Sequence, residues 1–153
     1  MTGPPWGDRD PVSPREKRGW LIETVERHAP EHLRFGPVPR EQITAFEARL
    51  GRPLPPALTA VLEGVGNGIF FGKEELFGPR RLMVHDIELL PDMLTVKAQA
   101  PGLPEAWLPF HRCDGVMHAV DLSPEAFGQV HSWPDGAVRG DIADFLADRL
   151  TPP

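Results

Sequence analysis

The sequence predicts an α+β fold with N-terminal helices, a central and mostly antiparallel sheet, and a closing C-terminal helix. Apolar residues recur at helical spacing in the first half of the chain, short β-type runs flank a tight-turn dipeptide in the second half, and the last segment is again amphipathic. Helices and strands are segregated along the chain, which favours an antiparallel sheet over a parallel, doubly wound one. With 153 residues, of which 41% are hydrophobic, the chain has the size of one domain.

The N-terminal region divides into an arm and the start of the domain. Residues 1–12 are rich in proline, glycine and charge, so we expect a flexible arm, followed by a single domain over residues 13–153. Ser13-Pro14-Arg15-Glu16 is a capping box with proline at the first helical position. It predicts a helix that begins there and ends near His28, before Pro30.

Two further helices follow. The first is predicted from Pro39 to Leu50, with Gly51 supplying the left-handed stop. The second is predicted from Pro55 or Pro56, and Asn67-Gly68 then turns the chain into the sheet. The apolar residues that we expect to be buried are Ile43, Phe46, Leu50, Leu58, Val61, Leu62 and Val65.

The middle of the chain changes period. Residues 69–71 and 81–84 are short apolar runs, and each predicts a strand. Residues 86–100 have helical spacing, with Asp86 as the predicted N-cap and a break at Pro91. The apolar positions behind this interpretation are Ile87, Leu90, Leu94 and Ala98.

The C-terminal part is the clearest β region. Residues 107–113 and 116–122 are predicted strands joined by Asp114-Gly115, a dipeptide that favours a two-residue hairpin turn. Residues 127–133 predict a third strand, and a helix is expected from Asp141. Its inward residues are expected to be Ile142, Phe145, Leu146 and Leu150, and its outer face Asp141, Asp144 and Asp148.

Charge and cysteine content limit the possible functions. The formal net charge is −6 and the pI is near 5.5. This disfavours nucleic-acid binding, which needs clustered Lys and Arg, and favours a basic partner. The chain has one cysteine, no apolar run resembling a signal peptide and no segment long enough for a membrane span. We therefore expect a cytoplasmic protein.

The predicted hairpin suggests one candidate site. A two-residue turn pairs His111 with His118 and places both on one face of the sheet with Cys113, a possible three-ligand zinc site. The same residues could form a Cys-His nucleophile pair, with Asp114 or Asp121 orienting the base. The alternative for all three is ordinary strand packing, with Cys113 as a small hydrophobe.

The segment around Gly51 resembles the signature of the SUKH superfamily, which contains bacterial immunity proteins of polymorphic toxin systems and fungal regulators of cell-wall synthesis. The signature is an isoleucine, a glutamate four residues later, Leu-Gly, Leu-Pro, an apolar helix and Asn-Gly. The matching residues are Ile43, Glu47, Leu50, Gly51, Leu54, Pro55, Leu58, Leu62, Asn67 and Gly68. Looser matches are Leu108-Pro109-Phe110, Asp121, Gly128, Val130, Ala143, Phe145 and Leu146.

The resemblance implies an α+β fold with no catalytic residues and no cofactor. For the bacterial members it implies an immunity protein that binds and neutralises a cognate toxin domain, often a nuclease. A non-catalytic regulatory or scaffold module is the second hypothesis, and a metal- or cysteine-dependent enzyme using His111, Cys113 and His118 is the third. From charge and expected exposure, we predict that the partner surface contains Glu63, Glu74, Glu75, Asp86 and Glu88.

Overall fold

The computed structural model describes residues 33–34, 38–64, 69–71, 74–84 and 86–150. The predicted N-terminal arm, the helix expected from Ser13 to His28 and the Asn67-Gly68 turn lie outside these ranges. The boundary between arm and domain therefore stays a prediction. Within the described residues the protein has an α+β architecture, as predicted.

Helices α2 (Arg40–Leu50) and α3 (Pro56–Gly64) confirm the two helices predicted on either side of Gly51, while Val65 lies outside the described residues. Pro39 occupies the N-cap of α2 with φ −60°. Gly51 ends the helix in the left-handed region at φ 79°, and its N–H donates to the Glu47 carbonyl oxygen at 2.8 Å. The buried side chains of the two helices face the core and are Ile43, Phe46, Ala57, Leu58, Val61 and Leu62.

Seven of the described strands form one sheet with the order β1-β2-β3-β6-β7-β8-β9. Every neighbouring pair in it is antiparallel. Its strands are β1 (Leu33–Arg34), β2 (Ile69–Phe71), β3 (Glu74–Leu76), β6 (Trp107–Cys113), β7 (Val116–Asp121), β8 (Gln129–Trp133) and β9 (Val138–Asp141). The short strands β1, β3 and β9 were not predicted, because each is short and, unlike the Ile-Phe-Phe run of β2, contains few apolar residues that would set it apart from a loop.

The β6–β7 hairpin has the predicted register. His111 lies opposite His118 and Cys113 lies opposite Val116. Asp114 and Gly115 both have positive φ, 50° and 81°, as a tight primed turn requires.

The prediction of a helix over residues 86–100 is half wrong. Its first part is a strand: β4 (Leu82–Val84) and β5 (Ile87–Leu90) form a separate two-stranded hairpin. Only α4 (Met93–Ala98) is helical, and its N-cap is Asp92, whose Oδ1 accepts from the Thr95 N–H at 2.8 Å. Asp86, the predicted cap, instead lies in the hairpin turn with φ 65°.

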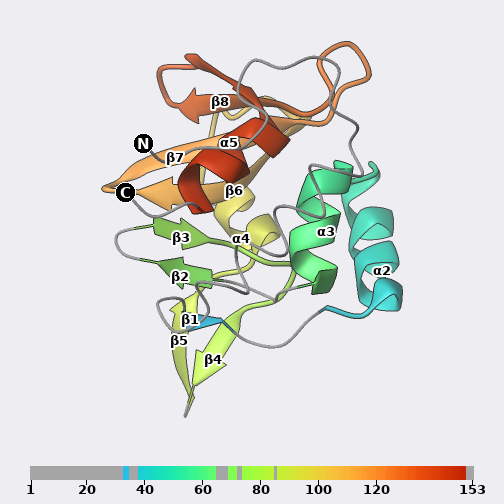
Figure 1. The fold of residues 1–153 in the computed structure, drawn as a ribbon, viewed down its shortest axis with the longest axis vertical. Helices are drawn as coiled ribbons and strands as arrows, with labels where there is room; N and C mark the ends of the chain where they lie inside the picture. The colour runs from blue at the N-terminus through green and yellow to red at the C-terminus, as the bar shows by residue number, and fades with distance from the viewer. Residues whose placement is uncertain (1–32, 35–37, 65–68, 72–73, 85, 151–153) are drawn as a thin grey trace.

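Helix α5 (Ile142–Leu150) closes the fold, as predicted. Figure 1 shows it lying across β6, β7 and β8, with α2 and α3 beside the sheet and the β4–β5 hairpin extending at the lower end. The Phe145 ring meets the Phe110 ring edge-on at 5.6 Å, so α5 is locked to the centre of the sheet. No helix in these ranges is both long and apolar enough to cross a bilayer.

Candidate protein-binding surface

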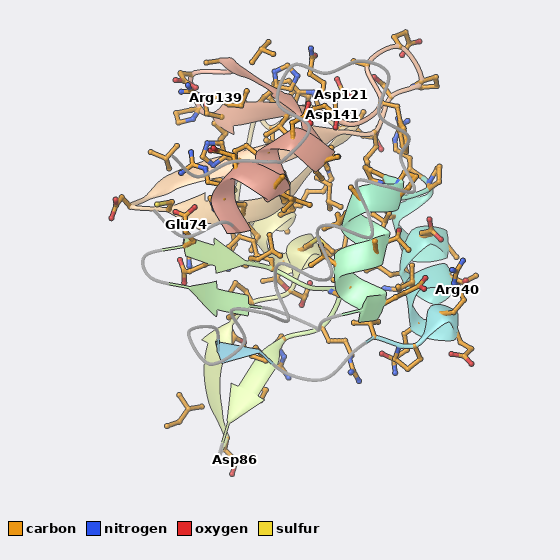
Figure 2. The ribbon with its side chains drawn as sticks, in the orientation of Figure 1. Arg40, Glu74, Asp86, Asp121, Arg139 and Asp141 are labelled. Atoms are coloured by element: carbon orange, nitrogen blue, oxygen red, sulfur yellow. The ribbon has the colours of Figure 1, made fainter. Side chains whose placement is uncertain are left out.

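The five acidic residues predicted to form the partner surface lie on different parts of the fold. Glu63 is in α3, Glu74 and Glu75 are in β3, Asp86 is in the β4–β5 turn, and Glu88 is in β5. Figure 2 shows Asp86 at the lower end of the molecule, well away from Glu74. The fold therefore does not gather all five on one continuous surface.

Salt bridges within the chain engage Glu63 and Glu75. Arg40 Nε lies 2.8 Å from Glu63 Oε1. Arg112 binds Glu75 through two nitrogens, at 2.7 and 3.3 Å. The side chains of Glu63 and Glu75 are only 30% and 24% exposed, so much of their negative charge is compensated before any partner arrives.

Glu74 is the most enclosed of the five, with a side chain 14% exposed. Its Oε1 lies 3.1 Å from His111 Nε2 and 3.4 Å from Arg149 Nη1. Burial raises the pKa of Glu74, but hydrogen bonds from His111 and Cys113 and electrostatic attraction to His111 and Arg149 outweigh it and lower the pKa to about 2. Glu74 thus serves as an anionic anchor between β3, β6 and α5.

The β4–β5 hairpin leaves its two carboxylates open. Asp86 is exposed in the turn, and Glu88 lies 3.6 Å from the exposed Arg81, a type of pair that contributes little. The same hairpin exposes Met83 and Ile87, the latter to 63%. Met83 pairs with Glu88 and Ile87 with Val84, so the two apolar side chains lie on opposite faces of the hairpin.

Of the predicted cluster of His111, Cys113 and His118, the structure brings the two histidines together in the interior, and Cys113 is only partly buried. His111 Nδ1 lies 3.1 Å from His118 Nδ1, and the two rings are 0% and 4% exposed. Glu74 Oε1 lies within hydrogen-bond distance of His111 Nε2, so the other ring nitrogen of His111, Nδ1, is the one that meets His118 Nδ1. Phe145 covers both rings from α5. Across the described chain, no group of three or more His, Cys, Asp or Glu side chains could hold a metal ion.

Cys113 is not activated as a nucleophile. Its pKa is raised to about 11 by a hydrogen bond to Glu74, by burial, and by the negative charges of Glu74 and Asp114. A thiol of this kind is protonated at neutral pH, whereas reactive cysteines have lowered pKa values. The surroundings of Cys113 therefore oppose the cysteine-nucleophile hypothesis.

The polar residues of the sequence signature fix loops to the scaffold. Glu47 Oε2 accepts from the Leu54 N–H at 2.7 Å, which holds the turn between α2 and α3. Asp121 accepts from Trp107 Nε1 at 3.2 Å and from the Ser123 N–H at 2.8 Å. Gly128 adopts φ 90° where β8 begins, a conformation that favours glycine.

A family model described as the SMI1 / KNR4 family (SUKH-1) matches residues 37–151. The chain belongs to this family. No curated protein matches it. In this SUKH-1 protein, the matched range covers the described helices and all described strands except β1.

The SUKH-1 fold also builds a surface feature that the sequence did not reveal. An open hollow of about 420 Å³ lies where the loop after β7 meets β9. Residues of this hollow were predicted from the sequence to lie in three separate elements: a loop, the start of a strand and the outer face of a helix. No local pattern in the sequence indicates that these elements meet. The lining residues are Pro124, Glu125, Ala126, Phe127, Gln129, Gly140 and Asp141.

Proposed function

We propose that this SUKH-1 protein is a cytoplasmic immunity protein that neutralises a cognate toxin domain by stoichiometric binding. The match to the SUKH-1 family over residues 37–151 carries the proposal. A net charge of −6 supports a basic partner such as a nuclease, whose substrate-binding cleft is positively charged. The enclosed histidines and the protonated Cys113 support binding without catalysis.

The β4–β5 hairpin is the best of the predicted acidic positions for meeting such a partner. Asp86 and Glu88 are exposed, whereas Glu63, Glu74 and Glu75 are engaged by arginines of the same chain. Exposed charges steer association over roughly one Debye length, about 8 Å at physiological salt. We therefore expect the hairpin carboxylates to act mainly on the association rate.

Co-expression with the toxic domain encoded by the adjacent gene tests the function. We expect the host to survive and the two proteins to elute as one complex from a sizing column. Continued killing, with the proteins eluting separately, would refute the proposal. Capture of a housekeeping protein instead would favour a regulatory module.

Charge reversal tests the role of the hairpin. Glu88→Lys should slow association severalfold at low salt, and added salt should reduce the difference. Glu41→Lys, an exposed residue in the first turn of α2, makes the same change in net charge. Equal slowing by both variants would show that only net charge matters and that the hairpin has no particular role.

A further inference from the structure

The hollow beside β9 has a rigid frame. Gly128 N–H donates to the Asp121 carbonyl oxygen and Ile142 N–H to that of Gly128, both at 2.8 Å. The Gln129 N–H donates to the Ala126 carbonyl oxygen at 3.0 Å. These bonds tie the loop after β7 to both β8 and the start of α5, so the backbone around the hollow is held in place before any ligand arrives.

Three of its side chains suit a positively charged group. Phe127 is exposed to 41%, although phenylalanine is among the residue types most often buried. Glu125 and Asp141 are exposed carboxylates that line the hollow. Asp141 Oδ1 accepts from the Ala143 N–H at 2.7 Å, which fixes the direction of this side chain and leaves its second oxygen for another donor. No Lys or Arg is found among the described residues that line the hollow.

The protein already uses this combination of groups twice. Arg112 lies over the Phe77 ring at 5.3 Å while it binds Glu75. Arg149 likewise lies 5.2 Å from the centre of the Phe145 ring while it pairs with Glu74. In both places an aromatic ring and a carboxylate hold one guanidinium. The hollow presents the same two kinds of group, and its described lining supplies no arginine.

We propose that this hollow is a docking site for an arginine side chain of a partner protein. The guanidinium stacks on Phe127 and donates to Glu125 and Asp141. Arginine suits the site better than lysine, because its planar group can stack on a ring and donate to two acceptors at once. The open, largely polar shape suits a side chain presented by a protein surface more than a small molecule, which needs a pocket that encloses it.

The inference relies on the proposed function only for the identity of the partner. The preference for arginine can be tested alone, by titrating the ¹⁵N-labelled protein with N-acetyl-arginine amide and following amide chemical shifts. We expect saturable shifts at Phe127, Gly140 and Asp141, weaker ones with N-acetyl-lysine amide, and none with the uncharged analogue N-acetyl-citrulline amide. Absence of saturation, or equal shifts at Asp86 and Glu88, would overturn the inference.

Matched variants identify the groups responsible. Phe127→Leu and Glu125→Gln should each weaken binding of N-acetyl-arginine amide about two- to fivefold, the effect expected for one exposed cation–π contact or ion pair. Glu41→Gln removes the same charge from the exposed first turn of α2, and it should leave binding unchanged. Equal weakening by Glu41→Gln and Glu125→Gln would refute a specific site. Since all three side chains are exposed, thermal unfolding should verify that the fold is intact.

The complex with the toxin domain gives the second test. The double variant Phe127→Leu/Glu125→Gln should raise the dissociation constant at least tenfold, and Glu88→Gln should raise it less. Unchanged binding by the double variant would refute the docking site while the proposed function stands. If the wild-type protein does not bind the domain, the proposed function fails, and the arginine titration alone decides the inference.

Discussion

Replacement of Glu47 should weaken the fold more than its position near the surface suggests. Glu47 Oε2 accepts from the Leu54 N–H at 2.7 Å, and the Leu54 residue is only 5% exposed. In Glu47→Ala this N–H loses its acceptor and gains little contact with water. A hydrogen bond to a charged group contributes about 1.5–3 kcal/mol, so we expect Glu47→Ala to lower the free energy of unfolding by about 2 kcal/mol. For a domain of this size, that corresponds to a melting temperature lower by about 4–8 °C.

Urea unfolding, followed by far-UV circular dichroism, measures this loss. Glu47→Gln keeps an acceptor oxygen and removes the charge, so it should cost about half as much. Glu41→Ala, an exposed change in the first turn of the same helix, should cost only about 0.3–1 kcal/mol. The reasoning is refuted if Glu47→Ala is no more destabilising than Glu41→Ala, or if Glu47→Gln is as damaging as Glu47→Ala.

Three further predictions concern the turn and the buried network. Gly51→Ala should lower the free energy of unfolding by about 1–2 kcal/mol in the same urea assay, because an alanine at φ 79° is strained. A Cβ at this position would meet no atom within 4 Å, so the cost comes from the backbone conformation alone. An unchanged urea midpoint would contradict this prediction. Iodoacetamide should alkylate Cys113 about 100-fold more slowly than an unperturbed thiol at pH 7.5, since the pKa of Cys113 rises from 9.0 to about 11. Glu74→Gln should speed this reaction, because it removes a negative charge beside the thiol. If wild-type Cys113 reacts as fast as free cysteine, the prediction is wrong. Burial and electrostatic repulsion from His111, Arg149 and Arg139 lower the pKa of His118 from 6.5 to about 4. As the pH falls, His118 is therefore protonated in the unfolded chain before it is protonated in the folded protein, and the free energy of unfolding should decrease between pH 6.5 and 4. His118→Gln should remove most of this decrease between pH 6.5 and 4. It should leave a second decrease in stability, between pH 4.5 and 2, which comes from Glu74, because its pKa is lowered from 4.5 to about 2.

The helices and the main hairpin could be predicted because their signals are local. Pro39 and Gly51 mark the ends of α2, and the Asp114-Gly115 dipeptide sets both the turn and the register of β6 with β7. Once the turn is known, the alternation of side chains along a strand places His111 and His118 on one face. Burial, by contrast, depends on α5, which comes much later in the chain and covers the pair with Phe145. The sequence therefore predicted which residues meet, while their enclosed state required the tertiary structure.

The β4–β5 hairpin shows where periodicity misleads. Ile87, Leu90 and Leu94 have helical spacing, yet only Leu94 lies in a helix. Leu90 is buried because it pairs with Leu82 at the base of the hairpin, and Ile87 is exposed to 63% near the turn. Three apolar residues at helical spacing are therefore insufficient when Pro91 interrupts the segment.

The acidic surface was the hardest feature to predict, because a carboxylate and its cation can be distant in sequence. Glu75 and its partner Arg112 are 37 positions apart, and Glu74 and Arg149 are 75 apart. No local pattern reveals these pairs, so a count of acidic residues overstates the charge that a partner meets. Glu88 also has an arginine nearby, but that pair is exposed and wide, at 3.6 Å.

Two pairs of exposed carboxylates lie at opposite ends of the molecule, and their separation makes the binding orientation measurable. The hairpin carries Asp86 and Glu88, and the hollow carries Glu125 and Asp141; Figure 2 shows Asp86 and Asp141 at opposite ends. A charge that only steers acts on the association rate and is screened by salt, whereas a group that docks an arginine acts on the dissociation rate. If the hollow is the contact, Glu125→Gln should speed dissociation at all salt concentrations, and Glu88→Gln should slow association only at low salt. The reverse pattern would place the interface at the hairpin.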